Sequence, residues 1–279
     1  MIIGVWARLS WLGAAGLLTA WALSACVSAG STTITGLPSG GNNGKDRVTA
    51  SDESDASKRA RVRLDLASAY FGRGQMTVAL DEVKLSIAAD PTVAAAFNLR
   101  GLIYASLGDE KLAEESFRRA LQLNSRDADS MQNFAWYLCQ QKRYPEANKL
   151  FEQALAVPQY RDSLRTQLAQ GVCLARAGQW AQAEQALQRA YELDPSNPST
   201  TMNLAEVLYR RGEADRARFY IRRVNNVPDV VNAQTLWLAA RIEKKLGNPQ
   251  GVAEAGEQLR NRFPQSLEAK AYERSQFDD

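Results

Sequence analysis

Small apolar residues recur at a fixed spacing over most of the chain. Two series of small residues begin after about residue 60: Ala67, Gly101, Ala135, Gly171, Ala205 and Ala239, and Ala79, Ala113, Ala147, Ala183 and Ala217. The step within each series is 34 residues, except that both series slip by two residues at the same place. One insertion in the segment 157–163 explains both slips. Such a period is typical of proteins built from repeated supersecondary units.

Each unit predicts a pair of helices. In the unit 94–127, Phe97, Gly101 and Tyr104 share one stripe of a first helix, and Gly108 ends that helix. Ala113 then lies on the apolar face of a second helix. Small residues are needed where the two helices cross closely, and large side chains fill the space beside them. The remaining faces are charged, so the sequence predicts an all-α protein of stacked helix pairs.

The unit resembles the tetratricopeptide repeat (TPR). The family pattern has a small residue at its eighth position, Tyr at the eleventh, Gly at the fifteenth, Ala at the twentieth, an aromatic residue at the twenty-fourth and Ala at the twenty-seventh. The resemblance implies an α-solenoid of about six helix-turn-helix repeats in a right-handed superhelix, over residues 58–274 with a tail at 275–279. The repeats lie near 60–93, 94–127, 128–163, 164–197, 198–231 and 232–265. The sixth is degenerate, because its turn at Gly247 comes one residue late.

The N-terminus has the layout of a bacterial secretion signal. Arg8 precedes the apolar run LSWLGAAGLLTAWALSA, which ends in small residues. A retained signal anchor is the alternative. The stretch Leu23-Ser24-Ala25-Cys26 resembles the lipobox of bacterial lipoproteins, which implies cleavage after residue 25 and lipidation of Cys26. Val27 rather than Asp follows it, which in Gram-negative relatives favours the outer membrane, with the protein facing the periplasm.

Residues 26–57 would then be the lipidated cysteine and a flexible tether. This segment is rich in Ser, Thr, Gly and Asn and has little that could build a core. The acidic residues Asp52, Glu53 and Asp55 could be considered a metal or acid site. A solvated run of linker charges is the favoured interpretation.

Composition excludes several kinds of chemistry. The chain has 34 Lys and Arg against 31 Asp and Glu, and this near balance gives no basic stripe for a nucleic acid. Histidine is absent, which removes the commonest general base and metal ligand. The three cysteines lie at 26, 139 and 173. Cys139 and Cys173 occupy stripes two positions apart, so two buried free thiols are favoured over a disulfide. We expect no catalytic residue, metal or cofactor.

The concave face of a TPR superhelix is a surface for protein segments. By repeat position it should present the fifth, ninth and twelfth residues of each first helix. The candidate groove residues are Phe71, Asn98, Leu102, Gln132, Trp136, Leu168, Met202 and Tyr209. They are largely apolar, unlike a clamp for carboxylates. The alternatives are that Phe71 and Trp136 pack between neighbouring helices and that Met202 fills the core.

The third repeat carries a more specific resemblance. Residues 131–147 read MQNFAWYLCQQKRYPEA, with an amide pair at Gln132-Asn133 and with Ala135-Trp136 where Gly-Gly is common in relatives. This stretch, the lipobox and the six repeats resemble the PilF/PilW (pilotin) family of type IV pilus biogenesis lipoproteins.

The resemblance implies a protein that binds the pilus secretin. Other pilus assembly proteins are further candidate partners. The protein would promote localisation, multimerisation or stability of the secretin in the outer membrane, and so support pilus biogenesis and twitching motility. Two alternatives stay open. The first is a general envelope scaffold TPR lipoprotein that organises peptidoglycan enzymes. The second is an enzyme with a cryptic carboxylate site, which no convergent acidic pair on the expected concave face supports.

Overall fold

The computed structural model describes residues 54–277, and every regular element in this range is an α-helix. The thirteen helices are α1 (Asp55–Gly72), α2 (Met76–Ala89), α3 (Ala94–Leu107), α4 (Glu110–Leu123), α5 (Ala128–Gln140), α6 (Tyr144–Leu155), α7 (Ser163–Arg176), α8 (Trp180–Leu193), α9 (Pro198–Arg210), α10 (Ala214–Asn225), α11 (Ala233–Lys245), α12 (Pro249–Arg262) and α13 (Leu267–Glu273). The predicted signal, Cys26, and the tether as far as residue 53 lie outside the described residues.

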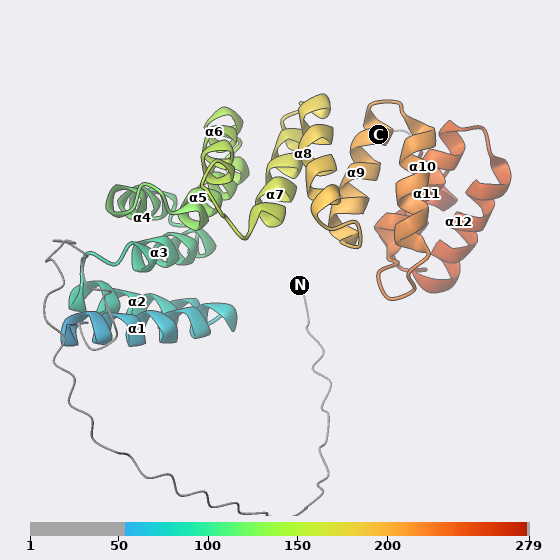
Figure 1. Cartoon of the computed structure of the whole chain (residues 1–279). Helices are drawn as coiled ribbons and strands as arrows, with labels where there is room; N and C mark the ends of the chain where they lie inside the picture. Colours follow the sequence, from blue (N-terminus) through green and yellow to red (C-terminus); the bar gives the residue numbers. More distant parts are fainter. Residues whose placement is uncertain (1–53, 278–279) are drawn as a thin grey trace, which may run out of the picture. The chain divides into compact units, whose positions relative to one another are not determined.

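Helices α1 to α12 form six helix pairs that follow one another in chain order (Figure 1). Each second helix packs against its own first helix, and those of the first five pairs also pack against the first helix of the next pair. Large side chains at the twenty-fourth repeat position are buried in the first five pairs, at Val83, Phe117, Phe151, Leu187 and Ile221. This packing confirms the all-α TPR solenoid predicted from the period.

The turns inside the pairs also follow the predicted pattern. Gly74, Gly108, Gly178, Gly212 and Gly247 have left-handed backbone conformations, with φ between 67° and 82°. Only glycine adopts this conformation without a steric cost from Cβ. The third pair has Lys142 at the equivalent position, also with a positive φ of 61°. The predicted two-residue insertion lies in the loop that joins α6 to α7.

The first helix begins earlier than expected. Helix α1 starts at Asp55, inside the segment assigned to the tether. The Ser54 hydroxyl accepts a hydrogen bond from the Ser57 backbone N–H at 3.1 Å and so caps the helix. Asp55 lies in the first turn, where a negative charge is stabilised by the helix dipole. The assignment of Asp55 to a linker is therefore wrong.

The sixth pair is shifted by one residue from the prediction. Ala240 is fully buried in α11, whereas Ala239 is only partly buried. The extra residue lies in the loop between α10 and α11. The turn at Gly247 therefore follows Ala240 at the same distance in sequence as the corresponding turns follow the small residues of the other first helices. The small residue at the close crossing is thus Ala240 and not Ala239.

A thirteenth helix, which the repeat count did not include, packs against α11 and α12. The chain after it was predicted to be a tail, but Phe277 is 9% exposed. Its ring lies 5.0 Å from the Trp237 ring and 5.9 Å from the Tyr272 ring, measured between centroids. Segment 267–277 therefore covers the end of the last helix pair.

A disulfide joins Cys139 in α5 to Cys173 in α7, with a Cα–Cα distance of 5.8 Å. The preference for two free thiols was wrong. That prediction assumed that two residues in contact on successive first helices occupy the same repeat position. Two helices that pack side by side present opposite sides to each other, so residues at different repeat positions come into contact. Asn98 and Asn133 on α3 and α5 are another such pair, since the Asn133 amide donates to Asn98 Oδ1 at 3.3 Å.

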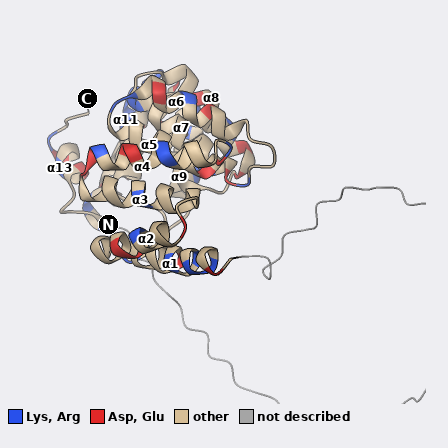
Figure 2. Ribbon diagram, turned by 90° about the vertical axis from the view of Figure 1, so that its left-hand side faces the viewer, with Lys and Arg blue, Asp and Glu red and all other residues tan. Residues whose placement is uncertain are grey.

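Both signs of charge occur along the described helices. In Figure 2, blue and red segments are scattered among tan ones on the visible helices. Within residues 54–277, no helix is long and apolar enough to cross a membrane.

Candidate protein-binding face

All eight predicted groove residues lie on the first helices of the pairs, namely α1, α3, α5, α7 and α9. We call the surface made by the fifth, ninth and twelfth positions of these helices the first-helix face. Seven of the eight are partly buried or accessible side chains, whereas Gln132 is only 6% exposed. A face of half-buried side chains can contact a partner and still pack on its own helix.

Three large residues stand on the N-terminal half of this face. Phe71 packs against the apolar cluster of the first two pairs. Leu102 and Trp136 pack against the next cluster, which contains the two cysteines of the disulfide. The Arg176 guanidinium lies over the Trp136 ring, 5.0 Å from its centroid. Trp136 is thus held between its own core and a cation from α7, with part of its ring accessible.

Amide side chains lie between these apolar residues. Asn98 and Asn133 are hydrogen-bonded across α3 and α5. Gln132, which precedes Asn133, is buried, and its Oε1 has no hydrogen-bond partner within the described part of the protein. These groups can donate to or accept from the backbone of a bound segment.

The C-terminal half of the face contains a hollow of about 240 Å³ between α9 and α11. Met202 and Glu206 line it from α9, and Trp237 and Arg241 line it from α11. The Arg241 guanidinium approaches the Glu206 carboxylate at 3.3 Å and also lies 4.6 Å from the centroid of the Tyr209 ring. The apolar walls and the ion pair together favour an amphipathic protein segment.

Sequence reasoning missed Trp237 and Arg241 because it treated the sixth pair as degenerate. With the register shifted by one residue, they occupy the fifth and ninth positions of their helix. The signal was the late turn at Gly247, which could have moved the whole pair by one residue.

Comparison with known proteins agrees with this architecture. The tetratricopeptide repeat family matches at residues 92–159, 133–198 and 174–236. The type IV pilus assembly protein PilF of Pseudomonas aeruginosa is 28% identical over 219 residues, which cover 78% of this chain and 86% of that protein. The crystal structure of PilW, a widely conserved type IV pilus biogenesis factor, is 30% identical with a TM-score of 0.71, over 76% of this chain and 97% of that chain. The structure of P. aeruginosa PilF has 26% identity and the same TM-score of 0.71, over 80% of this chain and all of that chain.

The chain belongs to the PilF/PilW family. It is therefore a TPR protein of type IV pilus biogenesis. The stretch 131–147 that suggested this family forms most of α5 and the start of α6. Its Gln132 and Trp136 lie on the first-helix face, whereas Ala135 is fully buried at the close helix crossing.

The described residues of this PilF/PilW family member carry little that resembles a reaction centre. Among residues 54–277, no group of three or more Cys, Asp and Glu side chains is placed to hold a metal ion. The carboxylates with shifted pKa values are held by ordinary ion pairs and turns. For example, the Arg143 guanidinium lowers the pKa of Glu114 from its usual range, with a further contribution from Arg118. The first-helix face is the candidate surface for contact with another protein.

Proposed function

We propose that this protein is a lipid-anchored outer-membrane factor that binds the type IV pilus secretin and promotes its localisation, assembly or stability. The observation that carries the proposal is the match to PilW and PilF along nearly the whole length of those chains. The proposed anchor is Cys26, followed by a tether that leads to α1. Pilus formation and twitching motility would depend on the secretin multimers that this protein supports.

The disulfide agrees with a periplasmic location. Disulfides form and persist in oxidising compartments such as the bacterial periplasm, and they are rare in the cytosol. The Cys139–Cys173 bond therefore supports export of the chain, which the N-terminal signal also predicts.

Deletion of the gene tests the function. We expect less heat-stable secretin multimer in the outer membrane, fewer pili and impaired twitching, all restored by the wild-type gene. Normal secretin multimers in the deletion strain would refute the proposal and favour an envelope scaffold that organises peptidoglycan enzymes.

A Cys26→Ser variant tests the anchor separately. Loss of the thiol prevents acylation, and each buried acyl CH₂ group contributes about 0.8 kcal/mol to membrane binding. We expect the variant to leave the outer-membrane fraction. Retention equal to that of wild type would show that Cys26 is not the anchor.

The first-helix face is the proposed secretin-binding surface. Binding energy tends to concentrate in aromatic anchors, which cost about 2 kcal/mol or more when truncated. We expect Phe71→Ala and Trp136→Ala to weaken secretin binding more than Met202→Ala or Tyr209→Ala. Melting temperatures measured beside the affinities separate a lost contact from unfolding. Larger losses at Met202 and Tyr209 would place the secretin at the hollow between α9 and α11 instead.

A further inference from the structure

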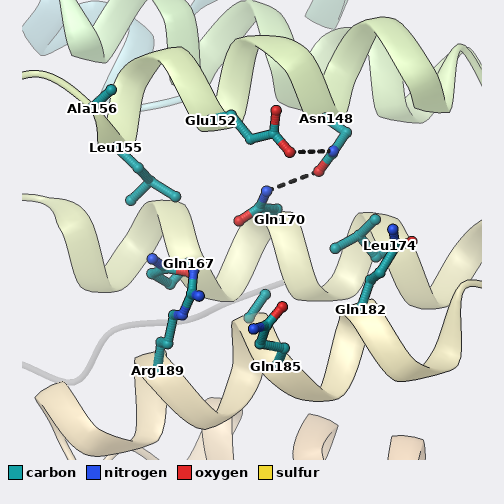
Figure 3. A pocket seen from close by; sticks show the side chains of 11 residues that line it. Asn148, Glu152, Leu155, Ala156, Gln167, Gln170, Leu174, Gln182, Gln185 and Arg189 are labelled. Atoms are coloured by element: carbon teal, nitrogen blue, oxygen red, sulfur yellow. Dashed lines mark hydrogen bonds between the residues drawn. The ribbon is translucent and has the colours of Figure 1, made fainter.

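A second hollow of about 410 Å³ lies between the second helices α6 and α8, with α7 as its floor (Figure 3). We call it the amide groove because five carboxamide side chains line it from three helices. They are Asn148 on α6, Gln167 and Gln170 on α7, and Gln182 and Gln185 on α8. The first-helix face contributes none of these residues.

The two floor amides are buried. Gln167 is 9% exposed and Gln170 is 7% exposed. They occupy the fourth and seventh positions of the repeat. The corresponding residues of the neighbouring pairs are not carboxamides: Phe97 and Arg100 in α3, Met131 and Phe134 in α5, and Thr201 and Leu204 in α9. The TPR fold itself therefore does not require amides at these positions.

One side of the groove is held by a hydrogen-bond chain. Gln170 Nε2 donates to Asn148 Oδ1 at 2.8 Å, and Asn148 Nδ2 donates to Glu152 Oε1 at 2.9 Å, as the dashed lines in Figure 3 show. These bonds fix the orientation of both amides. The groups are thus positioned before any ligand arrives, which reduces the entropy lost on binding.

Gln167 differs from its neighbour. Its Oε1 is buried and accepts no hydrogen bond within the described part of the protein. A buried carbonyl without a donor destabilises a folded protein, because it has lost its hydrogen bonds to water. A ligand N–H group that reached this oxygen would supply the missing hydrogen bond.

We propose that the amide groove binds an extended segment of a partner protein through the backbone of that segment. Carboxamides carry both donors and acceptors, and so do backbone peptide groups. The lining holds one carboxylate, Glu152, and one guanidinium, Arg189, so it has no excess charge that would select an anion. It also has no aromatic ring on which a sugar could stack.

The amide groove and the first-helix face are separate surfaces of α7. Gln167 and Gln170 stand at its fourth and seventh positions, whereas Leu168 belongs to the fifth-position stripe of the first-helix face. One molecule can therefore hold two protein segments at the same time. This inference does not depend on the secretin being the partner.

Selection from a displayed library of random dodecapeptides on the immobilised full chain tests the proposal. We expect peptides whose affinity falls about tenfold or more with Gln185→Ala and with Gln167→Leu. Gln188→Ala is the matched control, because this residue lies on α8 outside the groove lining and accepts a hydrogen bond from Tyr220. Gln185 is exposed, so its variant tests the groove even if Gln167→Leu does not fold. Selected peptides that bind wild type and both groove variants equally would overturn the proposal.

Replacement of single backbone amides by esters tests the contact itself. An ester removes one N–H from a selected peptide. We expect one such replacement to weaken binding to wild type about tenfold and to have little effect on binding to Gln167→Leu. If every ester replacement changes the affinity for wild type and for Gln167→Leu by the same factor, Gln167 does not accept a hydrogen bond from a backbone N–H. Soluble peptidoglycan disaccharides are the other probe. If they bind wild type and this binding is lost with Gln185→Ala, the groove binds a sugar and the proposal is overturned.

Discussion

Replacement of both Cys139 and Cys173 by alanine should destabilise the folded protein by about 4 kcal/mol at 25 °C. The bond joins α5 to α7 and closes the segment that contains α6 and the loop with the two-residue insertion. Both cysteines are buried, with exposures of 1% and 3%. Their bond therefore connects two helix pairs from inside the core.

The magnitude follows from the sequence separation of 34 residues. In the chain-entropy model a cross-link restricts the unfolded chain, and a loop of this length corresponds to an entropy change of about −13 cal/mol/K. At 25 °C this equals about 4 kcal/mol, a large part of the roughly 5–15 kcal/mol by which natural proteins are stable. A solenoid is stabilised mainly by contacts between neighbouring units. Removal of the disulfide should therefore destabilise mainly the junction of the third and fourth pairs.

Urea unfolding followed by circular dichroism gives the free energy of unfolding for the wild type and the double variant. Wild-type protein treated with a thiol reductant is the control for the lost sulfur atoms. If the cross-link stabilises the protein, reduced wild type and the double variant should unfold at similar urea concentrations, both well below oxidised wild type. A difference of less than about 1 kcal/mol between oxidised wild type and the variant would refute the reasoning.

Two further predictions concern packing and charge. Gly256→Ala should cost about 1–3 kcal/mol, because a Cβ at Gly256 would overlap the Tyr272 ring. Melting temperatures should show a smaller cost in a Tyr272→Ala background, and an equal cost would refute the clash. The hydrogen bond from Arg143 lowers the pKa of Glu114 below its ordinary value of 4.5, so this carboxylate stabilises the fold above that pH and loses the effect as the pH falls through the lowered pKa. Glu114→Gln should therefore reduce the melting temperature at pH 7 more than at about pH 3, and an equal reduction at both pH values would contradict this assignment.

The repeated helix pairs could be predicted because their signal is summed over many positions. Five small residues and five alanines in phase define the crossings of the first five pairs, and a local exception such as Lys142 does not disturb the period. The junctions between units are harder to predict. The Cys139–Cys173 bond and the hydrogen bond between Asn98 and Asn133 depend on which sides of two helices face each other. That relation is set by three-dimensional packing and has no fixed spacing in the sequence.

The amide groove could not be predicted for a similar reason. A glutamine in a helix is most often a solvated side chain, and nothing in the spacing of Gln167 and Gln170 separates them from Gln182 or Gln185. The structure separates them by burial, because α6 and α8 cover the two floor residues from either side. Whether a polar residue is a ligand contact or a surface residue depends on these neighbouring helices.

The end of the solenoid shows why its last pair looked degenerate. Once the register is shifted by one residue, Gly256 stands at the twenty-fourth position, where each of the first five pairs buries a large side chain. Gly256 leaves that space empty within its own pair. Tyr272 from α13 fills it, so that the missing side chain is supplied by the capping helix rather than by the repeat. A terminal repeat has no following pair to cover its exposed side. Loss of the consensus residue and the presence of α13 are therefore two parts of one packing arrangement.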